Sequence, residues 1–109
     1  MVQIDPTLPL SVTVDFQSRH RAAFRLFTRG PGETDPWIFL KEGSGDTTVI
    51  ATPLARGSIV KSEFIFFAGP DPFRAVMIFR QNGHLLEGGT RSVDAPGDDL
   101  FVADTAELA

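Results

Sequence analysis

The chain has 109 residues, a formal net charge of −4, 42% hydrophobic residues and 22% charged residues. This length and balance predict one globular domain over residues 1–109 and exclude a disordered chain. The absence of cysteine excludes disulfides and thiolate chemistry, and the acidic balance disfavours nucleic acid as a partner. Residues 1–10 lack the segments of a signal peptide, and no apolar run has the length of a membrane span. We therefore expect a cytoplasmic protein with no membrane contact.

The N-terminal third of the chain alternates apolar and polar residues with a period of two, the pattern of half-buried strands. It predicts strands at 10–16 and 21–29. The second strand places its arginines on the face opposite its buried residues. Two glycines and two prolines then interrupt regular structure, so 30–36 is predicted to be a loop.

The middle of the chain predicts a strand at 37–42 and a β-branched strand at 47–52, joined by a hairpin turn within 41–46. A longer strand follows at 58–67. Its phenylalanine-rich end has apolar residues on both faces, which is typical of a central strand. A second loop rich in Gly, Pro and Asp follows at 68–72.

The C-terminal third contains the strongest hairpin signal, Asn82-Gly83, because both residues suit a type I′ turn. Residues 104–109 are predicted to be a tail. The residues before this tail predict four strands, at 73–80, 84–87, 90–94 and 100–103.

About eight short strands and no helical periodicity predict an all-β fold. We expect an antiparallel β-sandwich of the jelly-roll or Greek-key type, with a closed barrel as the alternative. The segments 24–37 and 64–73 share a Phe-rich strand, a Gly-Pro, an Asp-Pro and an aromatic residue. They suggest two repeated meanders whose loops are related by a pseudo-twofold axis. The alternative, which we favour, is that unrelated turns use the same residue types.

Catalytic motifs are absent, and we expect a protein that is not an enzyme. The only histidines are His20 and His84, and both are expected to be exposed. His20 lies between Arg19 and Arg21, whose charges are expected to lower the pKa of its imidazole. Neither histidine has the spacing of a metal or triad motif.

An acidic segment near the C-terminus is the best candidate for a metal site. Carboxylate and carbonyl oxygens are the ligands that calcium prefers. The segment lacks the alternating spacing of an EF-hand loop, so the favoured alternative is a solvated acidic turn with no cofactor. The candidate calcium ligands are Asp94, Asp98 and Asp99.

A ligand site is predicted at the loops 30–37 and 68–73, where Trp37 and Phe73 follow the Asp-Pro pairs. Aromatic residues at such positions stack on sugars or fill a partner's pocket, and otherwise pack against the core. An arginine stripe at 19, 21, 25 and 29 suits an anionic ligand or an acidic protein, although Glu63 is a candidate cross-strand partner. The predicted ligand-binding residues are Trp37, Asp35, Phe73, Asp71, Arg25 and Arg29.

We therefore expect a non-enzymatic binding module that recognises a small polar ligand through its turns, such as the carbohydrate of a lectin. The alternative is a structural protein that makes only protein contacts and forms a homo-oligomer, most simply a dimer. Apolar residues on both faces of the central strands support this alternative, because an exposed apolar patch usually marks an interface. They are Ile65, Phe67, Val76 and Ile78.

Overall fold

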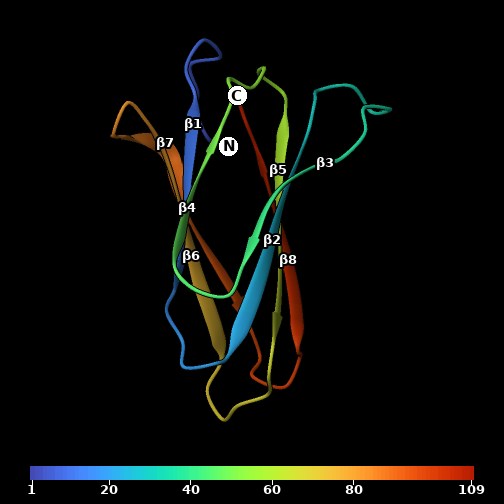
Figure 1. Ribbon diagram of the computed structural model, residues 1–109, viewed down its shortest axis with the longest axis vertical. Coiled ribbons are helices and arrows are strands. Elements are labelled where there is room, and N and C mark those ends of the chain that lie inside the picture. Colours follow the sequence, from blue (N-terminus) through green and yellow to red (C-terminus); the bar gives the residue numbers. More distant parts are fainter.

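The computed structural model describes residues 1–109 as eight β-strands in two four-stranded sheets (Figure 1). The two sheets enclose one hydrophobic core, so the predicted all-β antiparallel sandwich is confirmed. It has no helix of the length and apolarity needed to cross a membrane. The strands are β1 (Leu10–Phe16), β2 (Ala22–Arg29), β3 (Ile38–Gly43), β4 (Thr47–Ala51), β5 (Ile59–Phe66), β6 (Phe73–Gln81), β7 (His84–Ala95) and β8 (Phe101–Glu107).

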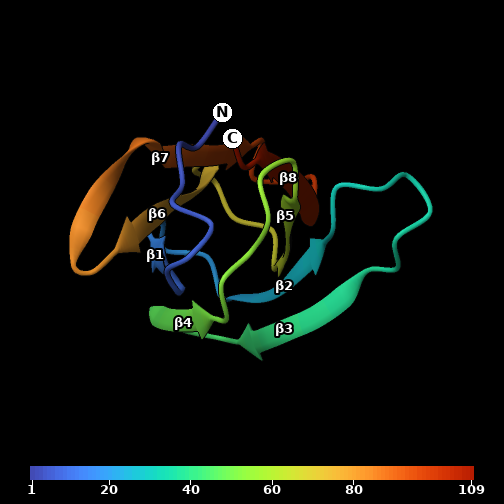
Figure 2. The ribbon, with the colours of Figure 1, turned by 90° about the horizontal axis from the view of Figure 1, so that it is seen from above.

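The strand order is β4-β1-β6-β7 in the first sheet and β3-β2-β5-β8 in the second (Figure 2). This order has an internal symmetry. Exchanging β1–β4 for β5–β8 turns the first sheet into β8-β5-β2-β3, which is the second sheet in reverse order. The chain therefore contains two four-stranded units with the same connectivity, each contributing two strands to each sheet.

The Gly-Pro and Asp-Pro motifs do not mark this symmetry, which agrees with the favoured alternative that unrelated turns use the same residue types. The loop at 30–37 joins β2 to β3, which are neighbours in one sheet, whereas the loop at 67–72 crosses from β5 in one sheet to β6 in the other. The two loops also lie at opposite ends of the sandwich (Figure 1). Gly, Pro and Asp favour any chain reversal, and they do not encode the sheet that the next strand joins.

Twenty buried hydrophobic residues form one core between the sheets, and they come mostly from alternate positions of the strands. Phenylalanine fills the end of the core where β5 passes to β6. There the Phe66 and Phe73 rings stack with their centroids 4.3 Å apart. A fully buried phenylalanine contributes roughly 1.5–3 kcal/mol to folding, so this end of the core is a major source of stability.

The two termini lie side by side and complete the sandwich. The Val2 N–H donates to the Glu107 carbonyl at 2.9 Å, and the Ala109 N–H donates to the Val2 carbonyl at 2.8 Å. Leu108 is fully buried. The predicted tail is therefore wrong, because residues up to Glu107 belong to β8 and pair with β5. That pairing depends on residues far away in the chain, which local composition does not encode.

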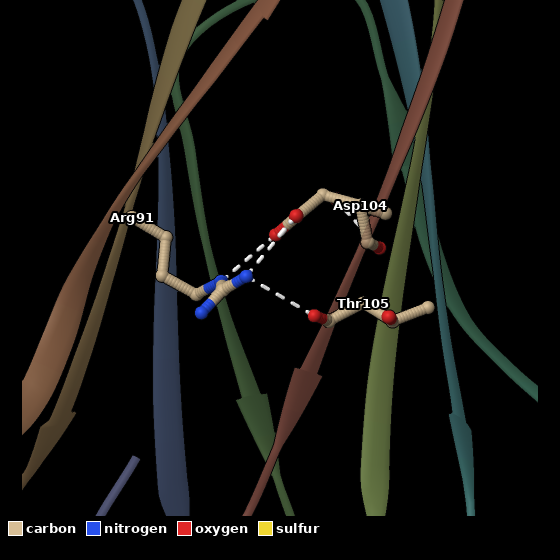
Figure 3. Close-up of polar contacts among 4 residues, drawn as sticks. Arg91, Asp104 and Thr105 are labelled. Atoms are coloured by element: carbon tan, nitrogen blue, oxygen red, sulfur yellow. Dashed lines mark hydrogen bonds and ion pairs between the residues drawn. The ribbon is translucent and has the colours of Figure 1, made fainter. Parts of the chain in front are cut away.

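The edge strands β7 and β8 are joined across the two sheets by Arg91 and Asp104 (Figure 3). Arg91 Nε donates to Asp104 Oδ2 at 2.8 Å, and its terminal nitrogen donates to Asp104 Oδ1 at 3.1 Å. The same nitrogen donates to the Thr105 carbonyl at 3.1 Å. β7 and β8 form no ladder with each other, so the side chains of this fork link the two edge strands where backbone hydrogen bonds do not.

Candidate functional site

The outer face of the sheet β3-β2-β5-β8 carries a cluster of aromatic and cationic side chains near the loop 30–37. Lys61 Nζ lies 4.4 Å from the centre of the Trp37 ring and 4.9 Å from that of Phe27. Arg29 Cζ lies 5.0 Å from the centre of the Trp37 ring. The Phe27 and Phe39 rings meet edge to face at 5.8 Å. These five residues are called the cation–aromatic cluster below.

Strand pairing brings the cluster together. Phe27 of β2 faces Phe39 of β3 on one side and Lys61 of β5 on the other. The alternation of β2 sends Phe27 and Arg29 outward while Phe24 and Leu26 are buried. The cluster is open to solvent, since Trp37 is 39% and Phe39 52% exposed. Its members therefore do not belong to the core.

The charges of the cluster are only partly balanced. Lys61 Nζ lies 3.8 Å from Glu63 Oε2, an ion pair that solvent partly screens. Arg25 lies two residues before Phe27 on β2 and pairs in register with Glu42 and Glu63. The sequence alone predicts Glu63 as a candidate cross-strand partner. Arg29 makes no ion pair, and its buried Nε has no hydrogen-bond partner. An anionic ligand would give this guanidinium a partner.

The structure brings two of the predicted ligand residues, Trp37 and Arg29, into the cluster, and it places Arg25 further along the same sheet face, between Glu42 and Glu63. Phe73 is fully buried and stacks on Phe66, so its predicted role in ligand binding is wrong. A phenylalanine after a loop packs inward here because it begins a strand whose alternate residues face the core.

The two predicted aspartates do not join the cluster. Asp35 Oδ2 accepts from the Gly32 N–H at 2.8 Å and closes its own loop. Asp71 belongs to the loop between β5 and β6, and that loop lies at the other end of the sandwich (Figure 1). Both follow the local rule that aspartate accepts hydrogen bonds within turns. The prediction that the loops 30–37 and 68–73 form one site is therefore wrong.

The three candidate calcium ligands do not gather into a site. Asp94 on β7 accepts from Arg74 Nε of β6 at 2.7 Å. Asp98 and Asp99 are exposed in the turn between β7 and β8. The structure contains no group of three His, Cys, Asp or Glu side chains that could hold a metal ion. The acidic segment is therefore divided between a strand and a turn.

His20 lies in the bend before β2, where it is half-buried, and its hydrogen bonds differ from what its sequence neighbours predict. Its Nδ1 and Nε2 each lie 2.7 Å from a carbonyl oxygen, those of Phe67 and Asp71. A neutral imidazole has one N–H donor, so two carbonyl acceptors are satisfied only by the imidazolium. The hydrogen bond to Phe67, followed by that to Asp71, raises the pKa of His20 above 6.5. The predicted decrease is wrong, because both carbonyl acceptors favour the protonated ring.

Sequence reasoning missed Phe27, Phe39 and Lys61 as members of a site. Period-two alternation does place Phe27 and Lys61 on outward faces, and this was the available signal. What the sequence does not show is that β2 lies between β3 and β5. Comparison with protein-family models, curated proteins and solved structures found no match to this chain.

Proposed function

We propose that the protein is a non-enzymatic binding module that recognises a small polar ligand, an acidic carbohydrate, at the cation–aromatic cluster. The observation that carries this proposal is the exposed Trp37 ring with the Lys61 and Arg29 cations 4.4 and 5.0 Å from its centre. Aromatic rings stack on the apolar face of a sugar. Guanidinium and ammonium groups pair with its carboxylate. The combination favours a sugar acid over a neutral sugar.

The rigidity of the sheet supports this function. Phe27, Arg29 and Lys61 lie on paired strands, so their backbones are held by the ladder between β2 and β5. A preorganised surface loses less conformational entropy when a ligand binds. Trp37 lies one residue before β3, so its backbone is outside the strand ladder. It is therefore suited to close onto a ligand.

The experiment is calorimetric titration with a trimer of galacturonic acid, using a neutral trimer of galactose as the ligand control. We expect Trp37→Ala to weaken binding of the acidic trimer about tenfold, which is about 1.4 kcal/mol. Phe101→Ala is the matched control, since Phe101 is an exposed aromatic on the same sheet, 49% exposed against 39% for Trp37, and lies outside the cluster. Equal affinity for both trimers, or no effect of Trp37→Ala, would contradict the proposal.

A second candidate function, assembly into a homo-oligomer through an apolar face, rests on a different part of the same sheet. Ile65 pairs in register with Phe101 and with Ala23, and this apolar row continues to Phe67. Ile65 is 48%, Phe101 49% and Phe67 70% exposed. Burying such a row between two copies is favoured by the hydrophobic effect.

This second function predicts a dimer by light scattering that Phe101→Glu converts to a monomer, because a buried unpaired carboxylate is unfavourable. An acidic protein partner would instead be held by the arginines, and its binding would weaken as salt screens charges over about 8 Å. A monomer at every salt concentration would remove the homo-oligomer.

A further inference from the structure

A groove of about 610 Å³ lies at the edge of the sandwich where β3 passes to β4, away from the cation–aromatic cluster. Its volume falls within the range of small-molecule sites. The end of β1, the start of β2, the turn 44–46 and the end of β5 line it. The lining residues used below are Phe16, Arg21, Ala23, Asp46, Ile65 and Phe67. It is called the edge groove here.

The groove exists because the edge strands end before their neighbours do. β3 pairs with β2 only as far as Phe24, and β4 pairs with β1 only as far as Val14. The turn 44–46 carries the chain from one sheet to the other at this level (Figure 1). Ala23 and Phe16 therefore have no edge strand beside them. The Phe16 N–H donates instead to Asp46 Oδ1 at 2.9 Å.

The interior of the edge groove is the open side of the hydrophobic core. The Phe16 ring packs on the buried rings of Phe24 and Phe64, with centroids 6.2 and 5.9 Å away. Ile65 and Phe67 form a second apolar wall and are largely exposed. An apolar ligand body placed here would remove these surfaces from water, which is favourable by roughly 25 cal/mol per Å².

The charge at the groove favours an anion. Arg21 Cζ lies 5.7 Å from the centre of the Phe67 ring, and its guanidinium makes no ion pair or hydrogen bond within the chain. His20 also lines the groove, but carbonyl oxygens occupy both of its ring nitrogens. Asp46 is the single acid in the lining, and its Oδ1 accepts from the Phe16 N–H. Arg21 is therefore the free charged donor of the groove.

We propose that the edge groove binds an amphiphilic carboxylate. The apolar chain lies against Phe16 and Ile65 over the small side chain of Ala23, and the carboxylate accepts two hydrogen bonds from the Arg21 guanidinium. This planar fork matches a carboxylate in both geometry and charge. The site is separate from the cation–aromatic cluster, since Ala23 lies about 13 Å along β2 from Phe27, the nearest cluster member on that strand. Its test therefore does not depend on sugar binding at Trp37.

The experiment is titration of the protein with decanoate, followed by calorimetry and by amide NMR shifts. We expect Arg21→Gln to weaken decanoate binding at least about tenfold, because the charged hydrogen bonds are lost. Arg19→Gln is the matched control, an exposed arginine two residues away and outside the groove. Ala23→Leu is expected to abolish binding by filling the groove, whereas Ala103→Leu, on the same sheet face, leaves it unchanged.

Three outcomes would overturn the proposal. The first is no binding of decanoate at millimolar concentration. The second is equal binding of decanoate and decylamine, which would show that the positive charge does not select the ligand. The third is unchanged binding in Ala23→Leu, which would place decanoate elsewhere on the apolar row. Thermal unfolding of each variant, matched against the parent chain, establishes that the fold is intact.

Discussion

At the scale of single residues, the protonation state of His20 makes the stability of the fold depend on pH. Its imidazolium joins the segment before β2 to the loop between β5 and β6, and its ring meets Phe66 edge to face at 5.2 Å. The raised pKa means that the folded state binds the proton more tightly than the unfolded chain does. The resulting stabilisation is complete below the unfolded pKa of about 6.5 and is lost as pH rises through the folded pKa.

We predict that NMR titration of the His20 ring nitrogens gives a pKa above 6.5. His20→Phe keeps an aromatic ring against Phe66 but cannot bind a proton. The free energy of unfolding of this variant should therefore fall less between pH 6 and pH 8 than that of the parent chain. An identical pH dependence in both proteins would contradict the imidazolium. The sequence context of His20 did not predict this state, because Phe67 and Asp71 are 47 and 51 residues away along the chain.

The Arg91–Asp104 fork is a second residue-scale feature, with side chains that are 29% and 25% exposed. A partly exposed pair contributes at most modestly, but the fork geometry and the link between two sheets favour a measurable interaction. A double-mutant cycle with Arg91→Met and Asp104→Ala should give a coupling energy of about 1 kcal/mol. The same cycle on Arg74 and Asp94, a more exposed pair within one sheet, should give less. Equal couplings would contradict a special role for the fork.

At the scale of elements, β7 shows why local patterns fail. The sequence predicts two strands, at 84–87 and 90–94, separated by Gly88-Gly89, whereas the structure has one strand with a large bulge. Leu85 faces Arg80 and Thr90 faces Ile78, so four residues of β7 lie opposite Phe79 alone. The bulge receives the N-terminal segment, since the Gln3 N–H donates to the Glu87 carbonyl at 2.9 Å. The glycines therefore serve a distant contact and do not end the strand.

Gly88 is a position in this bulge where both the backbone conformation and the space exclude a side chain. Its φ is +71°, and a Cβ there would overlap the carbonyl oxygen of Met1. Gly88→Ala is expected to lower the free energy of unfolding by about 1–3 kcal/mol. Gly45→Ala is the control, because Gly45 has no atom within 4 Å of the added Cβ, and it should change stability little. Denaturant unfolding measures the free energy of unfolding of both variants. Equal losses would contradict a steric clash between a Cβ at Gly88 and the N-terminal segment.

Other elements were predictable because their signals are local. The Asn82-Gly83 hairpin is confirmed, with φ values of 50° and 76° as a type I′ turn requires. β1, β2 and β5 match their predicted bounds within one residue, because each alternates buried and outward positions along its length. The predicted central position of β5 is confirmed as well, since it lies between β2 and β8. Apolar residues on both faces supplied that signal.

At the scale of the whole molecule, strand order decides which side chains meet, and composition does not encode it. Arg25, Arg29 and Trp37 were predicted because arginine and tryptophan are distinctive residue types. Lys61 joins them only because β5 lies beside β2. The edge groove likewise requires that β3 ends before β2 does and that β4 ends before β1 does. It therefore depends on how these four strands pair. The fold class was therefore within reach of the sequence, whereas the composition of either site was not.

The most direct test of the cation–aromatic cluster as a ligand site is the fluorescence of Trp37, titrated with the galacturonic acid trimer. The chain has one tryptophan and no tyrosine, so emission reports on this ring alone. We predict a saturable change in emission that weakens as salt is added, because Arg29 and Lys61 supply the charge that selects the ligand. Emission that stays constant up to millimolar trimer would contradict acidic-sugar binding at this face.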